Sequence, residues 1–334
     1  MDTSSTPAAL GTPRVSAGAR LLRSREAGIV AALVLMVALL AAASPEFRTT
    51  DNLLNNARNL SFVGMVALGQ AMVMITGGID LSAGSVWGLT AVSTAALMAQ
   101  GWPTWLAVGA GLGIAALFGL FNGLCVTKLR MPPFVPTLAT MAIARALALV
   151  ITRGKSINDF RPENDPFFGL GGGDTFGLPN PFLLFVALAV LAWVVLERTV
   201  FGRQLYAVGG NERAARLSGL EVDRLKVAVY VISAVTAGLA GIVEVSYLSS
   251  AIANQGLGKE LSVIAAAVIG GTALTGGIGT IYGAILGALI MQSLQSGMGM
   301  VGVDTPFQNI VVGTVLVLAV WVDIIYRKRT GAMK

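Results

Sequence analysis

The chain has 334 residues, of which 55% are hydrophobic and only 12% are charged. Soluble domains carry about 25% charged residues, so this composition excludes a water-soluble globular protein and predicts a polytopic membrane protein. The absence of histidine excludes histidine-based catalysis and most zinc sites, and the single cysteine, Cys125, excludes a disulfide within the chain. The net charge of +6 comes from basic residues near the ends of apolar stretches, which is an orientation signal for a membrane rather than a nucleic-acid signature.

The N-terminal segment, residues 1–26, is polar and contains four arginines. We expect it to be disordered and cytoplasmic. The first apolar stretch, Ala27–Ala43, ends in three alanines that resemble a signal-peptide cleavage site. Because the basic leader is long and the rest of the chain is equally apolar, we interpret this stretch as an uncleaved first membrane span.

Nine further apolar stretches follow, separated by polar or glycine-rich segments. Their approximate bounds are 60–76, 86–100, 102–127, 134–152, 182–196, 227–248, 261–274, 280–295 and 309–326. With ten spans, the basic clusters before the first, after the fourth, after the sixth and after the tenth fall on one side, which the positive-inside rule assigns to the cytoplasm. Both termini, including the tail 327–334, are then cytoplasmic, and the segments 44–59, 153–180 and 249–260 lie outside.

Two glycine-rich strings in distant parts of the chain resemble each other. GGIDLSAG (77–84) matches GGTALTGG (270–277) at both leading glycines and at several later positions, and GSVWG (84–88) matches GTIYG (279–283). Transporters often contain two related halves with broken helices near the substrate. The alternative is a chance match between glycine-rich strings, since the chain has 41 glycines that favour close helix packing.

Four charged residues lie within or beside predicted spans, where a charge is costly and marks a candidate functional position. Asp80 follows two glycines in the first of these strings, and we favour helix capping over a role in a transport pathway. Arg145 is in the middle of the fifth span, where we expect it to pair with a carboxylate or a helix end. Glu244 near the outer end of the seventh span is either at a substrate entrance or a snorkelling surface residue, and Asp323 is expected to pair with the C-terminal basic cluster.

These charges are too few and too scattered for a proton or sodium relay. The predicted spans instead contain amides and hydroxyls, which suit a neutral polar solute because such a solute needs hydrogen bonds rather than a countercharge. Taken singly, each of these side chains is more often an interhelical hydrogen bond. The candidate lining of a translocation pathway is Gln70, Thr76, Asp80, Ser82, Asn122, Gln292 and Gln295.

Signatures of an enzyme are missing from the sequence. Gly154-Lys155-Ser156 resembles the end of a phosphate-binding loop, but Leu149 stands where that motif requires its first glycine. The glycine-rich string 111–116 resembles a dinucleotide fingerprint, but no strand precedes it. We predict no catalytic residue, no metal site and no bound cofactor on this chain.

The most strongly charged segment inside the apolar chain is 198–226, which the positive-inside rule places in the cytoplasm. It contains a short predicted helix with Asn211 as its N-cap and Gly219 just beyond its C-terminus. Spacing alone is compatible with two interpretations. The helix is either a docking surface for a partner or part of a solvated loop that orients the chain.

A family resemblance starts in this segment. The run Arg213-Ala214-Ala215-Arg216-Leu217-Ser218-Gly219 resembles the coupling motif of ABC importer permeases, with Arg213 where that motif has a glutamate. Four longer strings closely resemble the monosaccharide permeases of the ribose, xylose and galactose type, in the same order and over about 45–327. They are MITGGIDLSAGSV, NGLCVTKLRMPPFVPTLATM, FGRQLYAVGGNERAARLSGLEV and AAAVIGGTALTGGIGTIYGAILGALI.

The resemblance implies an all-α membrane domain over 27–326, with about ten transmembrane helices in a bundle like that of type II ABC importers. It implies that 211–219 is a coupling helix docking into a sugar-importer ATPase subunit, which binds ATP and magnesium in place of this chain. It also implies a periplasmic sugar-binding protein facing the outer loops, a second permease copy, and a place in the bacterial inner membrane. Arg213 and Arg216 would then bind acidic groups of the ATPase, while Ala214 and Ala215 permit its close approach.

Three alternatives compete with a sugar permease. A branched-chain amino acid permease of the ABC class is the nearest, although the string GGIDLSAGS favours the sugar type. An ion-coupled secondary transporter working alone would need the acidic relay that the spans lack. A non-transporting membrane anchor would not need the polar residues in the spans. The sequence does not specify the sugar or decide between a homodimer and a heterodimer.

Overall fold

The structure is a computed structural model that describes residues 25–158, 160 and 166–329, with side chains described from 27 to 325 within these ranges. The predicted disordered segment 1–26 and the tail 327–334 therefore lie almost wholly outside the described residues. The described chain is nearly all helical. Its longer helices are α2 (Arg25–Ala43), α3 (Thr50–Ile75), α4 (Ala83–Ala99), α5 (Thr104–Thr127), α6 (Phe134–Thr152), α8 (Asn180–Trp193), α9 (Val200–Gly210), α11 (Val222–Leu248), α12 (Lys259–Ile269), α13 (Ile281–Met300) and α14 (Thr305–Arg329).

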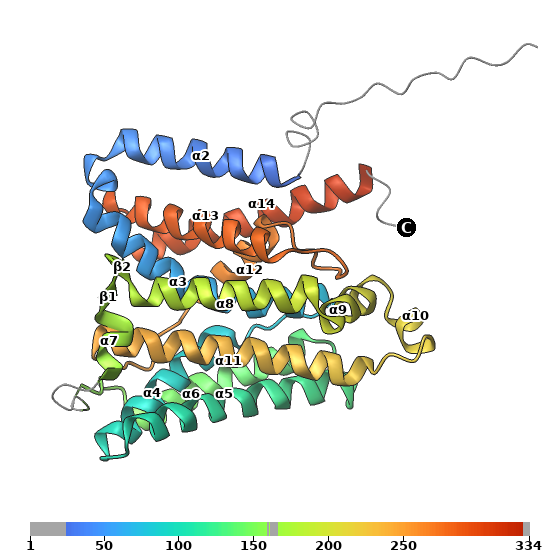
Figure 1. Cartoon of the computed structure of the whole chain (residues 1–334), viewed down its shortest axis with the longest axis horizontal. Coiled ribbons are helices and arrows are strands. Elements are labelled where there is room, and N and C mark those ends of the chain that lie inside the picture. Colours follow the sequence, from blue (N-terminus) through green and yellow to red (C-terminus); the bar gives the residue numbers. More distant parts are fainter. Residues whose placement is uncertain (1–24, 159, 161–165, 330–334) are drawn as a thin grey trace, which may run out of the picture.

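The long helices lie roughly side by side in a stack (Figure 1). The stack runs from α2 at the top, through α13, α3, α8 and α11, to α5 and α6 at the bottom. The short helix α10 (Glu212–Leu217) projects at one end, at the right of Figure 1. The opposite end has the helix α7 (Pro166–Gly172) and a hairpin of β1 (Asp174–Thr175) and β2 (Leu178–Pro179). Two shorter elements are η1 (Pro45–Arg48) and the π-helix η2 (Val194–Arg198).

Six helical segments of the described chain are long and apolar enough to cross a membrane. They are Thr50–Ile75, Thr104–Thr127, Phe134–Thr152, Asn180–Arg198, Val222–Leu248 and Thr305–Ile325. A helix also covers each of the other predicted spans, but α12 has only 11 residues, or about 17 Å, which is too short for a hydrocarbon core of roughly 30 Å. The polytopic all-α class is confirmed, and the count of ten crossings stays a prediction.

The predicted outer segment 44–59 is mostly helical. Thr49 accepts a hydrogen bond from the Asn52 N–H at 3.3 Å, which caps α3 ten residues before the predicted start of that span. The apolar run alone does not mark this start, because the first two turns of α3 are polar and exposed. The segment 153–180, also predicted as an outer loop, contains α7 and the hairpin.

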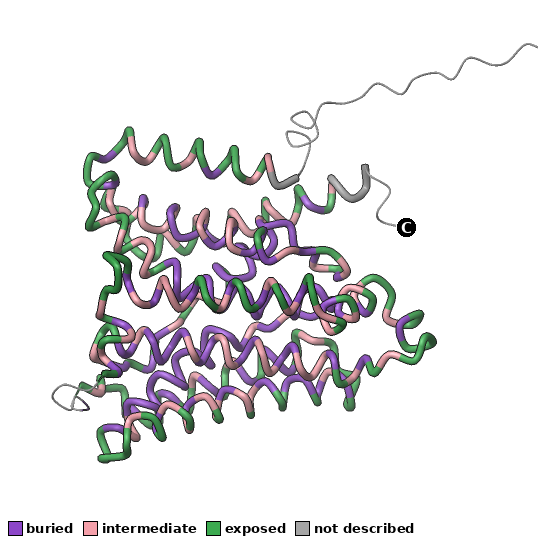
Figure 2. Tube along the Cα trace, in the orientation of Figure 1, coloured by how far each residue is buried: buried purple, intermediate pink, exposed green. Residues whose placement is uncertain are grey.

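The exposed surface of this bundle is apolar, as expected of a protein in lipid. The most apolar window of α3 is 89% buried, whereas that of α14 is only 11% buried, so α3 is central and α14 is peripheral. Figure 2 shows the exposed residues gathered on outer helices such as α2. The exposed side chains there are largely aliphatic or aromatic, for example Leu35, Val150 and Val317, which lipid tolerates and water does not.

Small residues bring the central helices together. On α5, a Cβ at Gly119 would lie 2.5 Å from the Tyr230 carbonyl of α11, whereas Gly113 on the same helix faces open space. The packed face of α5 is therefore defined by its glycines, as expected where no hydrophobic force drives helices together. Trp87, Tyr230 and Phe167 are the largest of the side chains that are almost fully buried.

Candidate functional site

The short helix α10 is positioned by its own capping residues. Asn211 Oδ1 accepts the Ala214 N–H at 3.0 Å, as the sequence predicts for an N-cap. At the other end, Gly219 has φ +85°, and the N–H groups of Gly219 and Leu220 donate to the carbonyls of Arg216 and Ala215 at 3.1 Å each. This is a Schellman motif, which closes a helix and favours glycine at the left-handed position.

An ion-pair network attaches α10 to the rest of the chain. Glu212 accepts hydrogen bonds from Arg216 at 2.9 Å and from Lys226 at 2.7 Å. Arg216 also contacts Asp223 at 2.7 Å, and Lys128 reaches the same carboxylate at 3.2 Å. The network therefore joins α10 to the start of α11 and to the turn after α5.

The network adds to one prediction from the sequence. Arg216, predicted to bind acidic groups of a partner, pairs with Glu212 and Asp223 of its own chain while its side chain is 46% exposed, so the partner role stays a prediction. Partial burial alone would raise the pKa of Glu212, but hydrogen bonds from Lys226 and Arg216 outweigh it and hold this pKa below its ordinary value. Glu212 therefore stays ionised at neutral pH, and the ion pairs that attach α10 to α11 are intact at that pH.

The outward face of α10 consists of Arg213, Ala214, Leu217 and Ser218. The Leu217 side chain is 90% exposed, which is unusual for a leucine outside lipid. Ala215 is only 4% exposed and packs against the chain's own core, so Ala214 alone of the alanine pair is available for close approach. A bulky residue at position 215 would disturb the packing of α10 against the core rather than the outward face of α10.

The two glycine-rich strings form two breaks between helices. The first break, 76–82, separates α3 from α4, and the second, 270–280, separates α12 from α13. The Gly277 N–H donates to the Ile75 carbonyl at 2.8 Å, and Gly77 lies beside the Thr275 carbonyl. The strings that match in sequence are thus neighbours in space.

The helix before α10 contacts the second break and the end of α3, where the first break begins. The Tyr206 hydroxyl on α9 donates to the Gly279 carbonyl of the second break at 2.7 Å. The Cα of Gly209 lies so close to the Ile75 carbonyl and the Gly277 N–H that an added Cβ would overlap them. The sequence pattern indicated neither this contact of Gly209 nor that of Tyr206.

The first break is held by a buried polar network. Asp80 accepts hydrogen bonds from the Ser82 N–H at 2.9 Å, the Ser82 hydroxyl at 2.6 Å and the Ser233 hydroxyl at 2.8 Å. Asn122 donates to Ser82 at 3.0 Å and accepts from Thr140 at 2.8 Å. Through these bonds α5, α6 and α11 all hold the break.

The predicted capping role of Asp80 needs correction. Its backbone partner is the N–H of Ser82, which precedes α4, whereas the residue at the N-cap position is Ser82 itself. Asp80 therefore orders the break rather than capping the helix. Three donors satisfy this carboxylate, which explains how it can be 1% exposed.

Of the other predicted pathway residues, Thr76 begins the first break, where it caps the end of α3 and donates to the Val73 carbonyl at 2.7 Å. Gln70 is fully buried on α3 with both amide atoms unpaired among the described residues. Gln292 and Gln295 lie on α13, where Gln295 accepts from Lys259 at 3.2 Å and donates to Ser262 at 3.0 Å. The seven residues thus form two groups, with Gln70 apart from both.

The remaining charged residues predicted in or beside the spans lie in different surroundings. Arg145 donates to the carbonyls of Ala253 at 2.5 Å and Gln255 at 2.9 Å, so it pairs with the backbone of the loop before α12. Glu244 accepts the Trp87 indole N–H at 2.7 Å and does not snorkel outward. Asp323 is buried, and the basic cluster expected to pair with it lies outside the described side chains.

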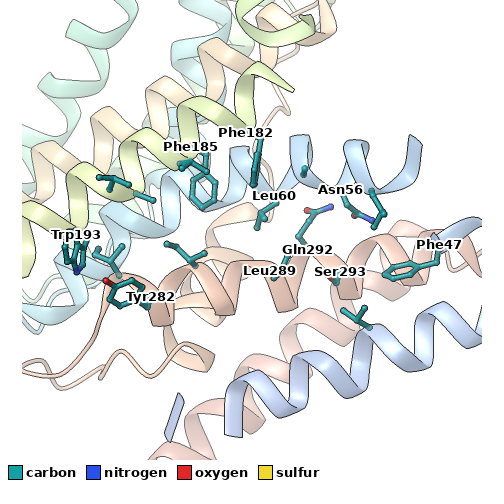
Figure 3. Close-up of a pocket in the computed structure, with 18 residues that line it drawn as sticks. Phe47, Asn56, Leu60, Phe182, Phe185, Trp193, Tyr282, Leu289, Gln292 and Ser293 are labelled. Carbon is teal, nitrogen blue, oxygen red and sulfur yellow. The ribbon is translucent and has the colours of Figure 1, made fainter. Parts of the chain in front are cut away.

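An apolar groove of about 620 Å³ lies between α2, α3, α8 and α13. Figure 3 shows Phe182, Phe185 and Trp193 along one side of it and Tyr282 and Leu289 along the other. Gln292 and Ser293 are among its few polar residues. Such a lining suits lipid chains and not a hydroxylated solute.

Comparison with known proteins places the chain in a family. The profile of the family described as "branched-chain amino acid transport system / permease component" matches residues 52–320. The chain belongs to this permease family. It is 41% identical to the ribose import permease protein RbsC of Escherichia coli K12 over 293 residues, covering 87% of this chain and 91% of that protein. No solved structure matches the chain significantly.

Two further relatives agree with the first. The chain is 40% identical to RbsC of Bacillus subtilis 168 over 291 residues, which cover 87% of this chain and 90% of that protein. It is 34% identical to the L-arabinose ABC transporter permease protein AraH of Azospirillum brasilense, over 98% of this chain and 95% of that protein. The predicted resemblance to ABC importer permeases is confirmed over almost the whole length.

The contact between α9 and the two breaks generates a first prediction. Replacing Gly209 with alanine should lower the melting temperature of the purified protein in detergent, because the new methyl group overlaps the Ile75 carbonyl. Overpacking of this kind costs about 1–3 kcal/mol. The matched control is Gly210→Ala, since a Cβ at Gly210 meets no atom within 4 Å. Equal melting temperatures for the two variants would contradict the assigned contact.

Proposed function

We propose that this chain is the membrane-spanning permease of an ATP-driven ABC importer that translocates a monosaccharide. The observation that carries the proposal is that α9, the helix directly before the exposed and capped α10, contacts both the second break and the end of α3, where the first break begins. The similarity to ribose and arabinose permeases over nearly the full length supports the same function.

In this mechanism, a conformational change of a separate ATPase subunit displaces α10. The partner binds ATP and magnesium and performs the hydrolysis, so this chain is not itself an enzyme. Leu217 and Ala214 offer a small apolar surface to a cleft, and Arg213 beside them attracts acidic groups of that cleft. The ion pairs of Glu212 and Arg216 keep α10 attached to α11, so that a displacement of α10 carries α11 and α9 with it.

The arrangement in the membrane follows from the same proposal. With α10 in the cytoplasm, both termini are cytoplasmic and the bundle crosses the bacterial inner membrane about ten times. The end with α7, the hairpin and the loop before α12 faces a periplasmic sugar-binding protein, which delivers the solute. A second copy of the permease completes the path between two subunits.

Two alternatives are less well supported. The relatives at 34–41% identity are named for ribose and arabinose, which favours a sugar over a branched-chain amino acid as solute. An ion-coupled transporter needs connected acidic groups, whereas Asp80 is hydrogen-bonded to the hydroxyls of Ser82 and Ser233.

The function is tested by uptake. Cells that express this chain with its ATPase and binding protein should accumulate labelled ribose or arabinose, and cells without the chain should not. Blocking ATP hydrolysis by a catalytic substitution in the ATPase should abolish accumulation, because this chain has no energy source of its own. Uptake that persists without hydrolysis would contradict an ABC importer.

The docking face is tested by a charge substitution. Leu217→Asp should remove most of the ATPase that copurifies with the permease and reduce uptake at least tenfold, because a carboxylate would be desolvated in the cleft. The matched control is Phe176→Asp, which changes a 95% exposed residue in the hairpin at the opposite end. Full copurification with the Leu217→Asp variant would show that α10 is not the docking face.

A further inference from the structure

A small polar cavity lies between α3, α4, α11, α12 and α13, toward the end opposite α10. Its volume is about 250 Å³, slightly below the roughly 300–1,000 Å³ of pockets for drug-sized ligands, so it has room for one small ring. Glu244 on its wall is about 33 Å along α11 from Val222, where the helix begins near α10. The cavity is thus separated from the coupling end by about the thickness of a membrane core.

Polar groups on two walls of the cavity are held in place by other residues. Glu244 accepts the Trp87 indole N–H at 2.7 Å, and Lys259 donates to the Gln295 amide oxygen at 3.2 Å. No ion pair joins Glu244 to Lys259 in the described part of the chain. The two groups attract each other across the cavity, and Gln255 also interacts with Glu244. A carboxylate accepts about four hydrogen bonds and an ammonium donates three, so both still have capacity for a molecule in the cavity.

Gln292 lines both this cavity and the apolar groove. The residue is only 7% exposed, and its amide makes no hydrogen bond to a described residue. Figure 3, a view of the groove, shows this side chain extending from α13 toward α3. The amide atoms are not fully enclosed by the chain, so they are open to a polar molecule that enters this space.

We propose that this cavity is a binding station for a single neutral monosaccharide during its passage through the membrane. A sugar ring presents several hydroxyls, each of which donates and accepts, and these match the carboxylate, the ammonium and the amide. Phe62 and Val63 supply an apolar wall for the C–H face of the ring. The proposal rests on the proposed function, which supplies the class of solute, whereas the cavity identifies where the solute is bound.

The test uses cysteine protection in the complete transporter, with the permease, its ATPase and the binding protein in proteoliposomes. The natural cysteine is removed by Cys125→Ser, and single cysteines are introduced by Asn59→Cys or Ser296→Cys in the cavity wall. The matched control is Asn55→Cys, one turn earlier on α3 and exposed. The readout is the rate of labelling by a charged thiosulfonate with and without ribose, L-arabinose or leucine.

We expect a monosaccharide that the transporter imports to slow labelling at positions 59 and 296 at least threefold, with no change at position 55. Protection by leucine alone would overturn the proposal in favour of a zwitterionic solute. Absence of protection by any imported monosaccharide would also overturn it, while leaving the proposed function intact. Failure of the wild-type transporter to import any sugar would instead refute the proposed function, and the sugar station with it.

A second variant measures the contribution of the unpaired amide. Gln292→Leu should raise the KM for sugar import about three- to tenfold with a smaller change in kcat, which is the effect of losing one neutral hydrogen bond to a ligand. Unchanged KM in a well-expressed Gln292→Leu variant would count against the cavity as the station. A control at Gln308, which lies on α14 and donates to the Val303 carbonyl at 2.8 Å, should leave KM unchanged when replaced by leucine.

Discussion

A backbone hydrogen bond joins the end of α3, where the first break begins, to the second break. The Gly277 N–H donates to the Ile75 carbonyl at 2.8 Å, and Gly209 of α9 lies against both groups. Ile75 ends the most deeply buried long span, and Gly277 lies four residues before α13. In the proposed mechanism, a displacement of α10 reaches both breaks through a few directly packed residues, so that no long chain of couplings is needed.

The two breaks solve the problem of exposed backbone in a membrane in different ways. Irregular backbone is tolerated there only where it is buried in protein or lines water, because lipid satisfies no hydrogen bond. The first break uses side chains, with Asp80, Ser82 and Asn122 held by neighbouring helices. The second uses turns closed by the backbone, such as Ala273 N–H to the Ile278 carbonyl at 2.8 Å, with glycines at positive φ. The first break is thus cross-linked to three helices, and the second is the simpler joint beside it.

Local chemistry was predictable from the sequence, and tertiary contacts were not. Asn211 and Gly219 mark the ends of α10 because capping depends only on neighbouring residues. The membrane class followed from composition, and the family from long matching strings. The inward pairing of Arg216, the burial of Ala215 and the contact of the two breaks depend on which faces pack together, and no periodicity in one segment reveals that. The similarity of the two glycine-rich strings was the one hint, but it indicates relatedness and not contact.

Hydrogen exchange in the assembled transporter measures the central claim most directly, which is that α10 and the two breaks move as a unit. Deuterium uptake would be followed in peptides that cover 76–82, 211–219 and 270–280, with and without ATP bound to a hydrolysis-deficient ATPase. The account predicts that uptake in the two breaks changes together with that in the α10 peptide. Protection of α10 on ATP binding with unchanged exchange in both breaks would contradict it.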